Sequence, residues 1–243
     1  MARFDGRKYN ELRPLIITPD VNRFAEGSVL IEQGNTKVYC TCSFEDRVPP
    51  HRKGTGLGWV TAEYAMLPRA NRERSQRDIS KLKLQGRSAE IQRLIGRSLR
   101  AVVDMELMGE TCLTIDCDVL QGDGGTRCAS ITGGFVAMAL ACRRLTDQRV
   151  FKKNPIKDYV CALSTGIITL DGRDQAVVDI CYEEDSTALA DCNLVMTGDG
   201  RFVEIQGTGE GRPYSADELI NIIRVTQPCL EKVIEAQKAI ITL

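Results

Sequence analysis

The chain has 243 residues, 43% of them hydrophobic and 27% charged, and its formal net charge is −1. This composition is ordinary for a soluble globular protein, and the length allows one large domain or two small ones. No apolar run approaches the roughly 20 residues of a membrane span, and the first residues do not resemble a signal peptide. We therefore expect a cytoplasmic protein without a membrane segment.

The chain contains ten cysteines but only one histidine. No two cysteines have the CxxC spacing, so the sequence argues against a zinc site. Most of the cysteines lie in apolar or alternating segments. This placement is typical of small core residues in a reducing compartment.

The near-neutral total hides a strongly basic segment. Residues 69–100 contain ten Lys or Arg and three Asp or Glu, a net charge of +7, which leaves −8 for the rest of the chain. A local charge of this size indicates a polyanion or an acidic partner surface.

The first half of the chain begins with three strand-like runs, Leu15–Thr18, Ser28–Glu32 and Lys37–Ser43. The last two flank Gly34-Asn35, a plausible hairpin turn, which predicts a mixed sheet with an antiparallel portion. A helix is predicted from Gly86 because apolar residues recur there at helical spacing. These residues are Ile91, Leu94, Ile95, Leu99, Val102 and Val103.

Two polar loops precede this helix. Residues 48–58 carry His51, which has no nearby carboxylate or cysteine and is interpreted as a solvated side chain. Residues 69–77 are rich in arginine. Such a charge run is usually an exposed loop, and the functional alternative is a contact with RNA phosphates or with a neighbouring subunit.

The segment 111–134 changes from a strand to a glycine-rich turn and then to a helix. Alternating apolar residues predict the strand, and the turn contains Gly122, Gly124 and Gly125. Backbone N–H groups at such a turn and the start of a helix attract oxyanions. Thr126 adds a hydroxyl, and Arg127 adds a guanidinium suited to phosphate. The alternative interpretation is an ordinary tight turn between a strand and a helix. The motif is not a P-loop, because no Gly-Lys-Ser/Thr follows the glycines.

The second half contains a predicted strand at Val160–Leu170, a turn at Asp171-Gly172 and a return strand at Ala176–Tyr182. If the extended backbone continued, Asp179 and Asp185 would face the same way and could share a divalent cation. Carboxylates suit magnesium or manganese, although an acidic cluster on a hairpin is more often simply exposed.

The C-terminal part contains a strand at Val203–Gln206 and a long amphipathic helix. The spacing of Ser215 and Glu218 is that of a capping box at the start of this helix. Pro228 is expected to kink or briefly interrupt it.

Four segments resemble the RNase PH family of phosphate-dependent exoribonucleases. The longest is D-C-D-V-L-Q-x-D-G-G-T-R-x-A-S-I-T-G, from Asp116 to Gly133. The others are A-E-G-S-V-L-I-E-x-G-x-T-K-V from Ala25, R-x-x-E-I-Q-R-L-I-x-R-S-L-R from Arg87, and D-x-x-x-x-E-D-S from Asp179. Together the matches extend the resemblance over essentially the whole chain.

The resemblance implies a fold and a set of site residues. The implied fold is α/β, a mixed sheet with packed helices in a single domain over residues 1–243, of the ribosomal-protein-like βαβα type with two related halves. The resemblance assigns phosphate binding to Arg87, Gly125, Thr126 and Arg127. It assigns metal binding and catalysis to Asp179 and Asp185. RNA or subunit contacts are assigned to Arg69, Arg74 and Arg77, while Arg72 has no counterpart and the role of Asp191 stays open.

The resemblance also implies an activity. It is phosphate-dependent 3′→5′ removal of nucleotides from tRNA precursors and other RNAs, which releases nucleoside diphosphates and is reversible. Inorganic phosphate is the co-substrate, the metal is magnesium or manganese, and the assembly is a homohexamer built as a trimer of dimers. The main alternative is a catalytically silent RNA-binding ring subunit of the exosome type, which would lack the phosphate arginines or the acidic pair. A hydrolytic ribonuclease is a second alternative, in which Arg87 and Arg127 would have no evident purpose.

Overall fold

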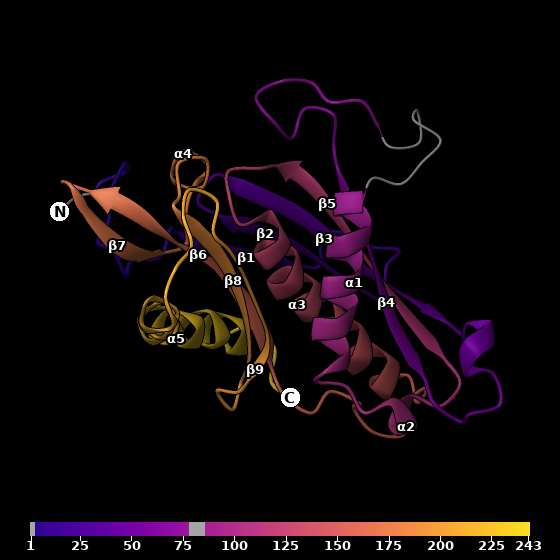
Figure 1. Ribbon diagram of the computed structural model, residues 1–243. Helices are drawn as coiled ribbons and strands as arrows, with labels where there is room; N and C mark the ends of the chain where they lie inside the picture. The colour runs from indigo at the N-terminus through magenta and orange to yellow at the C-terminus, as the bar shows by residue number, and fades with distance from the viewer. Residues whose placement is uncertain (1–2, 78–85) are drawn as a thin grey trace.

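Two β-sheets and several helices make up residues 3–77 and 86–243, the part of the chain that this computed structural model describes (Figure 1). The first sheet has the strand order β1-β2-β3-β5-β4, and only β4 and β5 run parallel. Its strands are β1 (Leu15–Pro19), β2 (Gly27–Gln33), β3 (Thr36–Glu45), β4 (Trp59–Met66) and β5 (Cys112–Gln121). The predicted hairpin turn at Gly34-Asn35 is confirmed, with Gly34 at φ +58° between β2 and β3.

The second sheet is antiparallel throughout and has the order β7-β6-β8-β9. Its strands are β6 (Val160–Leu170), β7 (Arg173–Val178), β8 (Ala190–Thr197) and β9 (Phe202–Thr208). The α/β class is confirmed, but the expected mixed sheet is divided into two sheets. Both faces of β6 are buried, so this strand needs a covering layer on each side.

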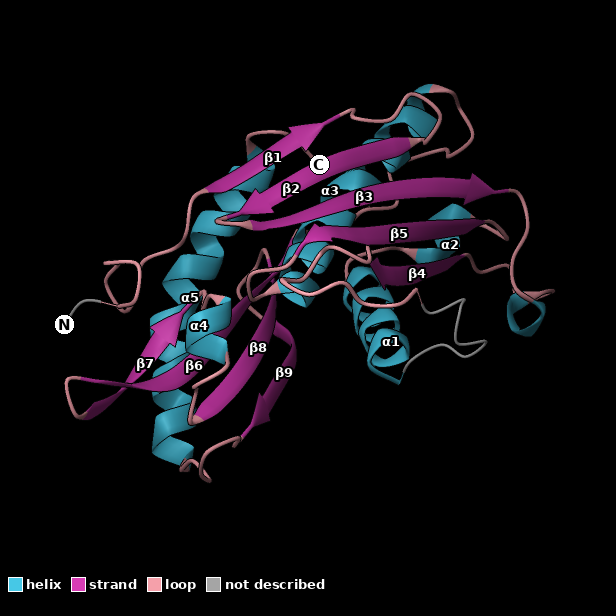
Figure 2. Ribbon diagram, turned by 90° about the horizontal axis from the view of Figure 1, so that it is seen from above, coloured by secondary structure: helices cyan, strands magenta, loops and turns pink. Residues whose placement is uncertain are grey.

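Helix α3 (Thr126–Asp147) is the layer between the two sheets (Figures 1 and 2). It contacts β2 and β3 on one side and β6 on the other, and Gly27 permits the close approach. A Cβ atom on Gly27 would lie 2.0 Å from the carbonyl oxygen of Ala137. By length and composition α3 is apolar enough to cross a membrane, but 89% of its most apolar window is buried within the protein. Its apolar character is therefore accounted for by the core.

Two amphipathic helices complete the layers, and both confirm their predicted apolar faces. Helix α1 (Gly86–Arg100) packs against β4 and α3, and α5 (Ala216–Lys238) packs against β6 and β7. The capping box of Ser215 and Glu218 is present. Of the two expected effects of Pro228, the interruption is wrong, because the helix continues through this residue. Buried residues on both sides of the proline, including Ile222 and Leu230, hold the two parts against the same sheet.

The connection after β7 differs from the predicted strand over Ala176–Tyr182. Strand β7 ends at Val178, Asp179 has a left-handed backbone with φ 55°, and a short helix α4 (Tyr182–Asp185) follows. The turn formed by residues 179–185 is called the acidic turn below. Two further short helices, η1 (Pro50–Arg52) and α2 (Met105–Met108), lie in connections. Lys81 and Lys83 of the basic segment lie outside the described residues.

Candidate active site

A cleft of about 1170 Å³ opens where the two sheets meet the first turns of α1 and α3. The segments that line it come from both halves of the chain. They are the end of β4, the turn between β5 and α3, the start of α1, the acidic turn, and parts of β6, β8 and β9. The cleft therefore forms only when the two sheets pack on α3.

One wall of the cleft is the glycine turn, residues 122–126. Gly125 is the N-cap of α3, with φ 67°, so the helix begins at Thr126 and its free N–H groups lie at the cleft. The Thr126 hydroxyl lies 2.9 Å from the hydroxyl of Tyr64, a buried residue of β4. Burial raises the pKa of Tyr64, although the Thr126 hydrogen bond and the charges of Arg87 and Arg127 oppose the rise. This wall can bind an oxyanion through a helix N-terminus and a hydroxyl.

Two arginines add positive charge to the same wall. Arg127 follows the glycine turn, and its Nη1 donates to Glu90 Oε1 at 3.3 Å and to Gln206 Oε1 at 3.1 Å. Arg87 lines the cleft from the first turn of α1. The four predicted phosphate-binding positions, from Arg87 to Arg127, therefore lie together on the cleft, as a phosphate site requires.

A second wall carries the two aspartates that line the cleft, Asp185 at the end of α4 and Asp191 in β8. Glu90 and Glu210 line the cleft as well. The pKa of Asp185 is raised, first because the walls around the cleft reduce the hydration of its carboxylate, and second because of the charge of Asp191. The charges of Arg87 and Arg127 oppose this rise. One carboxylate oxygen of Asp191, Oδ1, is buried without a hydrogen-bond partner. An unpartnered oxygen beside a second carboxylate is a suitable place for a cation.

The structure contradicts the continuous strand from which the pairing of Asp179 with Asp185 was inferred. Asp179 is only 1% exposed, it does not line the cleft, and its carboxylate accepts hydrogen bonds from Arg13. The chain turns at Asp179 and enters α4 instead of continuing as a strand. Asp191 is the second aspartate that lines the cleft. The sequence contained a signal for it, since Asp191 also lies six residues from Asp185.

The arginine-rich loop extends beside the cleft without placing its predicted arginines in the lining. Arg69, Arg74 and Arg77 are exposed, whereas the neighbouring residues Asn71, Ser75 and Gln76 line the cleft. Arg72 forms an ion pair with Glu183 and stacks over the ring of Tyr182 at 5.3 Å. The loop is thus joined to the acidic turn through Arg72.

Other arginines of the basic segment have structural contacts. Arg97 pairs with Glu204 of β9 at 2.5 Å, and Arg100 donates to the carbonyl of Val60. His51 packs edge-on against Trp59 and does not line the cleft. Sequence patterns did not indicate the cleft positions of Tyr64 and Gln206, because their neighbours there come from distant segments.

The chain belongs to the 3′ exoribonuclease family. The model of domain 1 of this family matches residues 11–143, and the model of domain 2 matches residues 158–227. The chain is 53% identical to Ribonuclease PH of Bacillus pumilus over 238 residues, which cover 98% of this chain and 97% of that protein. It is 52% identical to Ribonuclease PH of Bacillus subtilis over 239 residues, 98% and 96% of the two chains. The predicted family is confirmed, and the chain is a phosphate-dependent 3′→5′ exoribonuclease.

Solved structures with the same fold come from more distant proteins. Rice Rrp46 has a TM-score of 0.78 at 16% identity, with 97% of this chain and 98% of that chain covered. The Archaeoglobus fulgidus exosome with RNA bound to the active site has a TM-score of 0.79 at 21% identity, with 97% and 92% covered. At these identities the likeness establishes the fold alone.

Proposed function

We propose that the cleft between the two sheets is where this enzyme carries out phosphorolysis. The observation that supports the proposal is the meeting of two arginines, a helix N-terminus and two aspartates in one cleft. An anionic phosphate must attack an anionic diester, so the site has to stabilise negative charge on both reactants. One wall of the cleft binds the inorganic phosphate, and the wall with the two aspartates acts on the scissile phosphate of the RNA.

The glycine turn and the arginines hold the inorganic phosphate. Gly125 and Thr126 present N–H groups and a hydroxyl, while Arg87 and Arg127 supply charge-assisted hydrogen bonds. Because Arg127 also donates to Gln206, its guanidinium has a defined direction along the wall. The side chains thereby orient a phosphate oxygen toward the RNA.

Asp185 and Asp191 are the residues that would hold magnesium or manganese. The unpartnered Asp191 oxygen and the raised pKa of Asp185 both fit a cation between them. No cluster of three or more Asp, Glu, His or Cys side chains suited to a metal occurs in the described ranges, so water and RNA phosphates would supply the other ligands, as is usual for Mg²⁺. A cation held there would neutralise charge on the scissile phosphate and on the leaving oxygen.

The reaction then follows from these two walls. A phosphate oxygen attacks the phosphorus of the last phosphodiester, and the bond from that phosphorus to the preceding 3′-oxygen breaks. The electron pair leaves with the 3′-oxygen, which takes up a proton, and Asp185 is the carboxylate best suited to assist that transfer. The products are a nucleoside diphosphate and an RNA shorter by one nucleotide. The reverse reaction adds a nucleotide from a diphosphate.

We further propose that the RNA is the 3′ end of tRNA precursors and of other RNAs, held by the basic loop with Arg69, Arg74 and Arg77. Residues 1–243 act as one domain because α3 packs against both sheets. A cytoplasmic location fits the ten free, buried cysteines.

A homohexamer, built as a trimer of dimers, is supported by the exposed apolar side chains at and near the edge strand β1. Phe24 is 80% exposed and Ile16 is 54% exposed. The catalytically silent subunit is not favoured, because Arg87, Arg127 and Asp185 are all present on the cleft together with Asp191.

The test is a single assay of a 3′-extended tRNA with magnesium, with and without inorganic phosphate, in which the released nucleotide is identified. Nucleoside diphosphates that appear only with phosphate are expected. Monophosphates released without phosphate would make the protein a hydrolase. An assembled protein that binds the RNA but releases nothing would support the silent subunit.

A further inference from the structure

We propose that Arg13 and Asp179 are positioning residues that fix the glycine turn of the cleft relative to the acidic turn. This inference rests on the proposed function, since it concerns the distance between the phosphate site and the carboxylate pair. Neither residue lines the cleft, and both are at least 95% buried. They act on the reaction through the two turns that they join.

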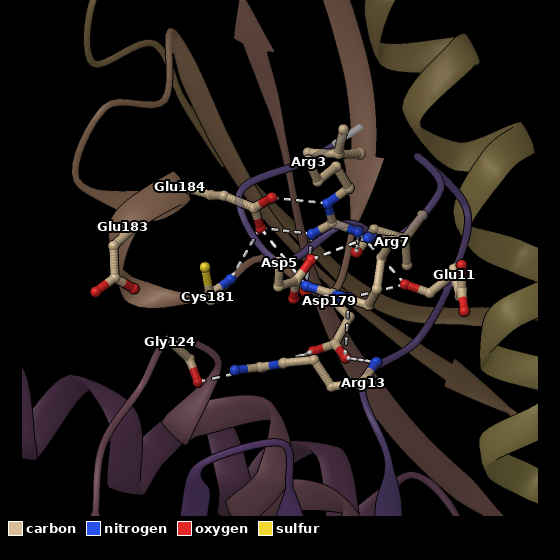
Figure 3. A network of polar contacts seen from close by, with 12 residues as sticks. Arg3, Asp5, Arg7, Glu11, Arg13, Gly124, Asp179, Cys181, Glu183 and Glu184 are labelled. Carbon is tan, nitrogen blue, oxygen red and sulfur yellow. Dashed lines mark hydrogen bonds and ion pairs between the residues drawn. The ribbon is translucent and has the colours of Figure 1, made fainter. Parts of the chain in front are cut away.

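The contact between the two residues uses both oxygens of the carboxylate. Asp179 Oδ1 accepts from Arg13 Nε at 3.0 Å and from Arg13 Nη2 at 2.6 Å, while Oδ2 accepts from the Arg13 backbone N–H at 2.7 Å. Two guanidinium donors share one carboxylate oxygen and the backbone N–H binds the other, which restricts the orientation of the guanidinium (Figure 3). The remaining donors of Arg13 therefore have fixed directions.

Those remaining donors reach the glycine turn. Arg13 Nη1 donates to the carbonyl of Asp123, and Nη2 lies 3.5 Å from the carbonyl oxygen of Gly124. The turn in addition touches the acidic turn directly, since a Cβ on Gly124 would lie 2.4 Å from the carbonyl oxygen of Ile180. The Asp123 carboxylate accepts from the Tyr182 N–H, at the start of α4, at 3.2 Å. A displacement of Arg13 would thus move both walls of the cleft.

A second buried ion pair fixes the other end of the acidic turn. Arg3 donates from Nε and Nη2 to Glu184 at 2.7 and 2.5 Å, and its Nη1 donates to the carbonyl of Val178 at 2.7 Å. Glu184 also accepts from the Cys181 N–H at 3.1 Å (Figure 3). The residue after Glu184 is Asp185, so the N-terminal arm holds the segment that presents the catalytic carboxylate.

The physical cost of this arrangement indicates a role beyond stability. Buried ion pairs contribute little net stability compared with apolar residues of similar volume, and a non-glycine residue with φ 55° is strained. What the pair provides is a fixed geometry between segments about 60 positions apart in the sequence. A misplacement of about 1 Å between reacting groups costs about 100-fold in rate.

The test compares Asp179→Asn and Arg13→Lys with the Gln237→Leu variant. Gln237 is a buried polar residue between α3 and β6, outside the cleft, so its loss should lower the melting temperature without affecting the turns. Assays well below each melting temperature should show kcat lowered about 10- to 100-fold for the first two variants. The KM for RNA should change less than about twofold, and Gln237→Leu should keep the kcat of the parent enzyme.

The magnesium dependence separates positioning from direct metal binding. We expect the Mg²⁺ concentration for half-maximal rate to stay within about twofold in Asp179→Asn, and to rise more than about tenfold in Asp185→Asn. A similar rise in Asp179→Asn would make Asp179 a ligand and overturn the proposal. Unchanged kcat in folded Asp179→Asn would overturn it too. If that variant does not fold, Arg13→Lys decides, because lysine keeps the charge but cannot bridge the carboxylate and the turn together.

An Arg127→Ala enzyme assayed in parallel separates this inference from the proposed function. An unchanged KM for phosphate in Arg127→Ala would refute the phosphate site itself. A raised KM in Arg127→Ala together with a normal kcat in Asp179→Asn and Arg13→Lys would refute the positioning role alone.

Discussion

The two walls of the cleft are built in different ways. The phosphate wall comes mainly from one continuous segment, in which Gly125, Thr126 and Arg127 are consecutive at the start of α3. The acidic wall combines Asp185 from a short helix with Asp191 from β8, and buried ion pairs fix the turn between Asp179 and Asp185. The sequence of groups on the phosphate wall is defined by the local backbone of a helix start, and Arg13 holds the turn before it. The two aspartates of the acidic wall, in contrast, are brought together only by the fold. Substitutions should affect the two walls in different ways.

The largest effect is expected from Asp185→Asn and Asp191→Asn. Each change keeps the size of the side chain but removes a negative charge, and with it a metal ligand or a proton carrier. We expect kcat to fall by about 10²- to 10⁴-fold while RNA binding is retained, because the arginines are untouched. Steady-state kinetics and a filter-binding assay measure the two quantities.

The matched control is Glu183→Gln. Glu183 lies in the same short helix but pairs with Arg72 and does not line the cleft. Its variant should stay within about twofold of the parent rate. If Glu183→Gln lost as much activity as Asp185→Asn, the loss would come from the reduced negative charge of the acidic turn and not from Asp185 and Asp191 specifically.

On the phosphate wall, Arg127→Ala should act on binding instead. Hydrogen bonds to charged groups contribute about 1.5–3 kcal/mol, so the KM for phosphate should rise about 10- to 100-fold. The KM for RNA should change much less. Arg93→Ala is the control, because Arg93 is an exposed α1 residue outside the cleft lining. A phosphate KM that is unchanged in Arg127→Ala would remove this residue from the phosphate site.

The same contrast explains what could be predicted from the sequence. Strand and helix positions followed from apolar periodicity, and the phosphate residues from a turn whose parts are adjacent in the chain. The Asp179–Arg13 contact could not be predicted, because it depends on a left-handed turn and on a partner 166 positions away. The sequence indicated Asp191 only by its six-residue spacing from Asp185, and its role stayed open. The division into two sheets was not predicted, because periodicity indicates which residues are buried but not which strands pair.

The charges of the two walls also act on each other, and a titration tests this coupling. The pKa of Asp185 is raised by its confined surroundings and then by Asp191, and it is lowered by Arg87 and Arg127. Asp191→Asn removes a negative neighbour and should therefore lower the pKa of Asp185. Arg87→Ala removes a positive neighbour and should raise it. The change is measured from the carboxyl carbon resonance of Asp185 in metal-free protein.

The carboxylate of Asp174 serves as an internal control in the same spectra. Asp174 pairs with Arg212 and does not line the cleft, so its titration should be the same in both variants. Because Asp185 must be ionised to bind a cation, metal-supported activity should fall as the pH decreases through its raised pKa. Shifts of Asp185 in the same direction in both variants would contradict the assignment of opposite charge effects.

The smallest expected effect comes from Glu90→Gln. In the structure, Glu90 pairs with Arg127 at 3.3 Å and so competes with phosphate for the guanidinium, but its side chain is 52% exposed. Exposed ion pairs contribute about 0.2–1 kcal/mol, so the KM for phosphate should fall about two- to fivefold with kcat unchanged. The difference in the KM for phosphate between Glu90→Gln and the parent enzyme should become smaller at high salt, where exposed charges are screened. A rise in the KM would instead mean that Glu90 orients Arg127 for phosphate, and this contact from α1 would then support the phosphate wall together with the contact that Arg13 makes with the glycine turn.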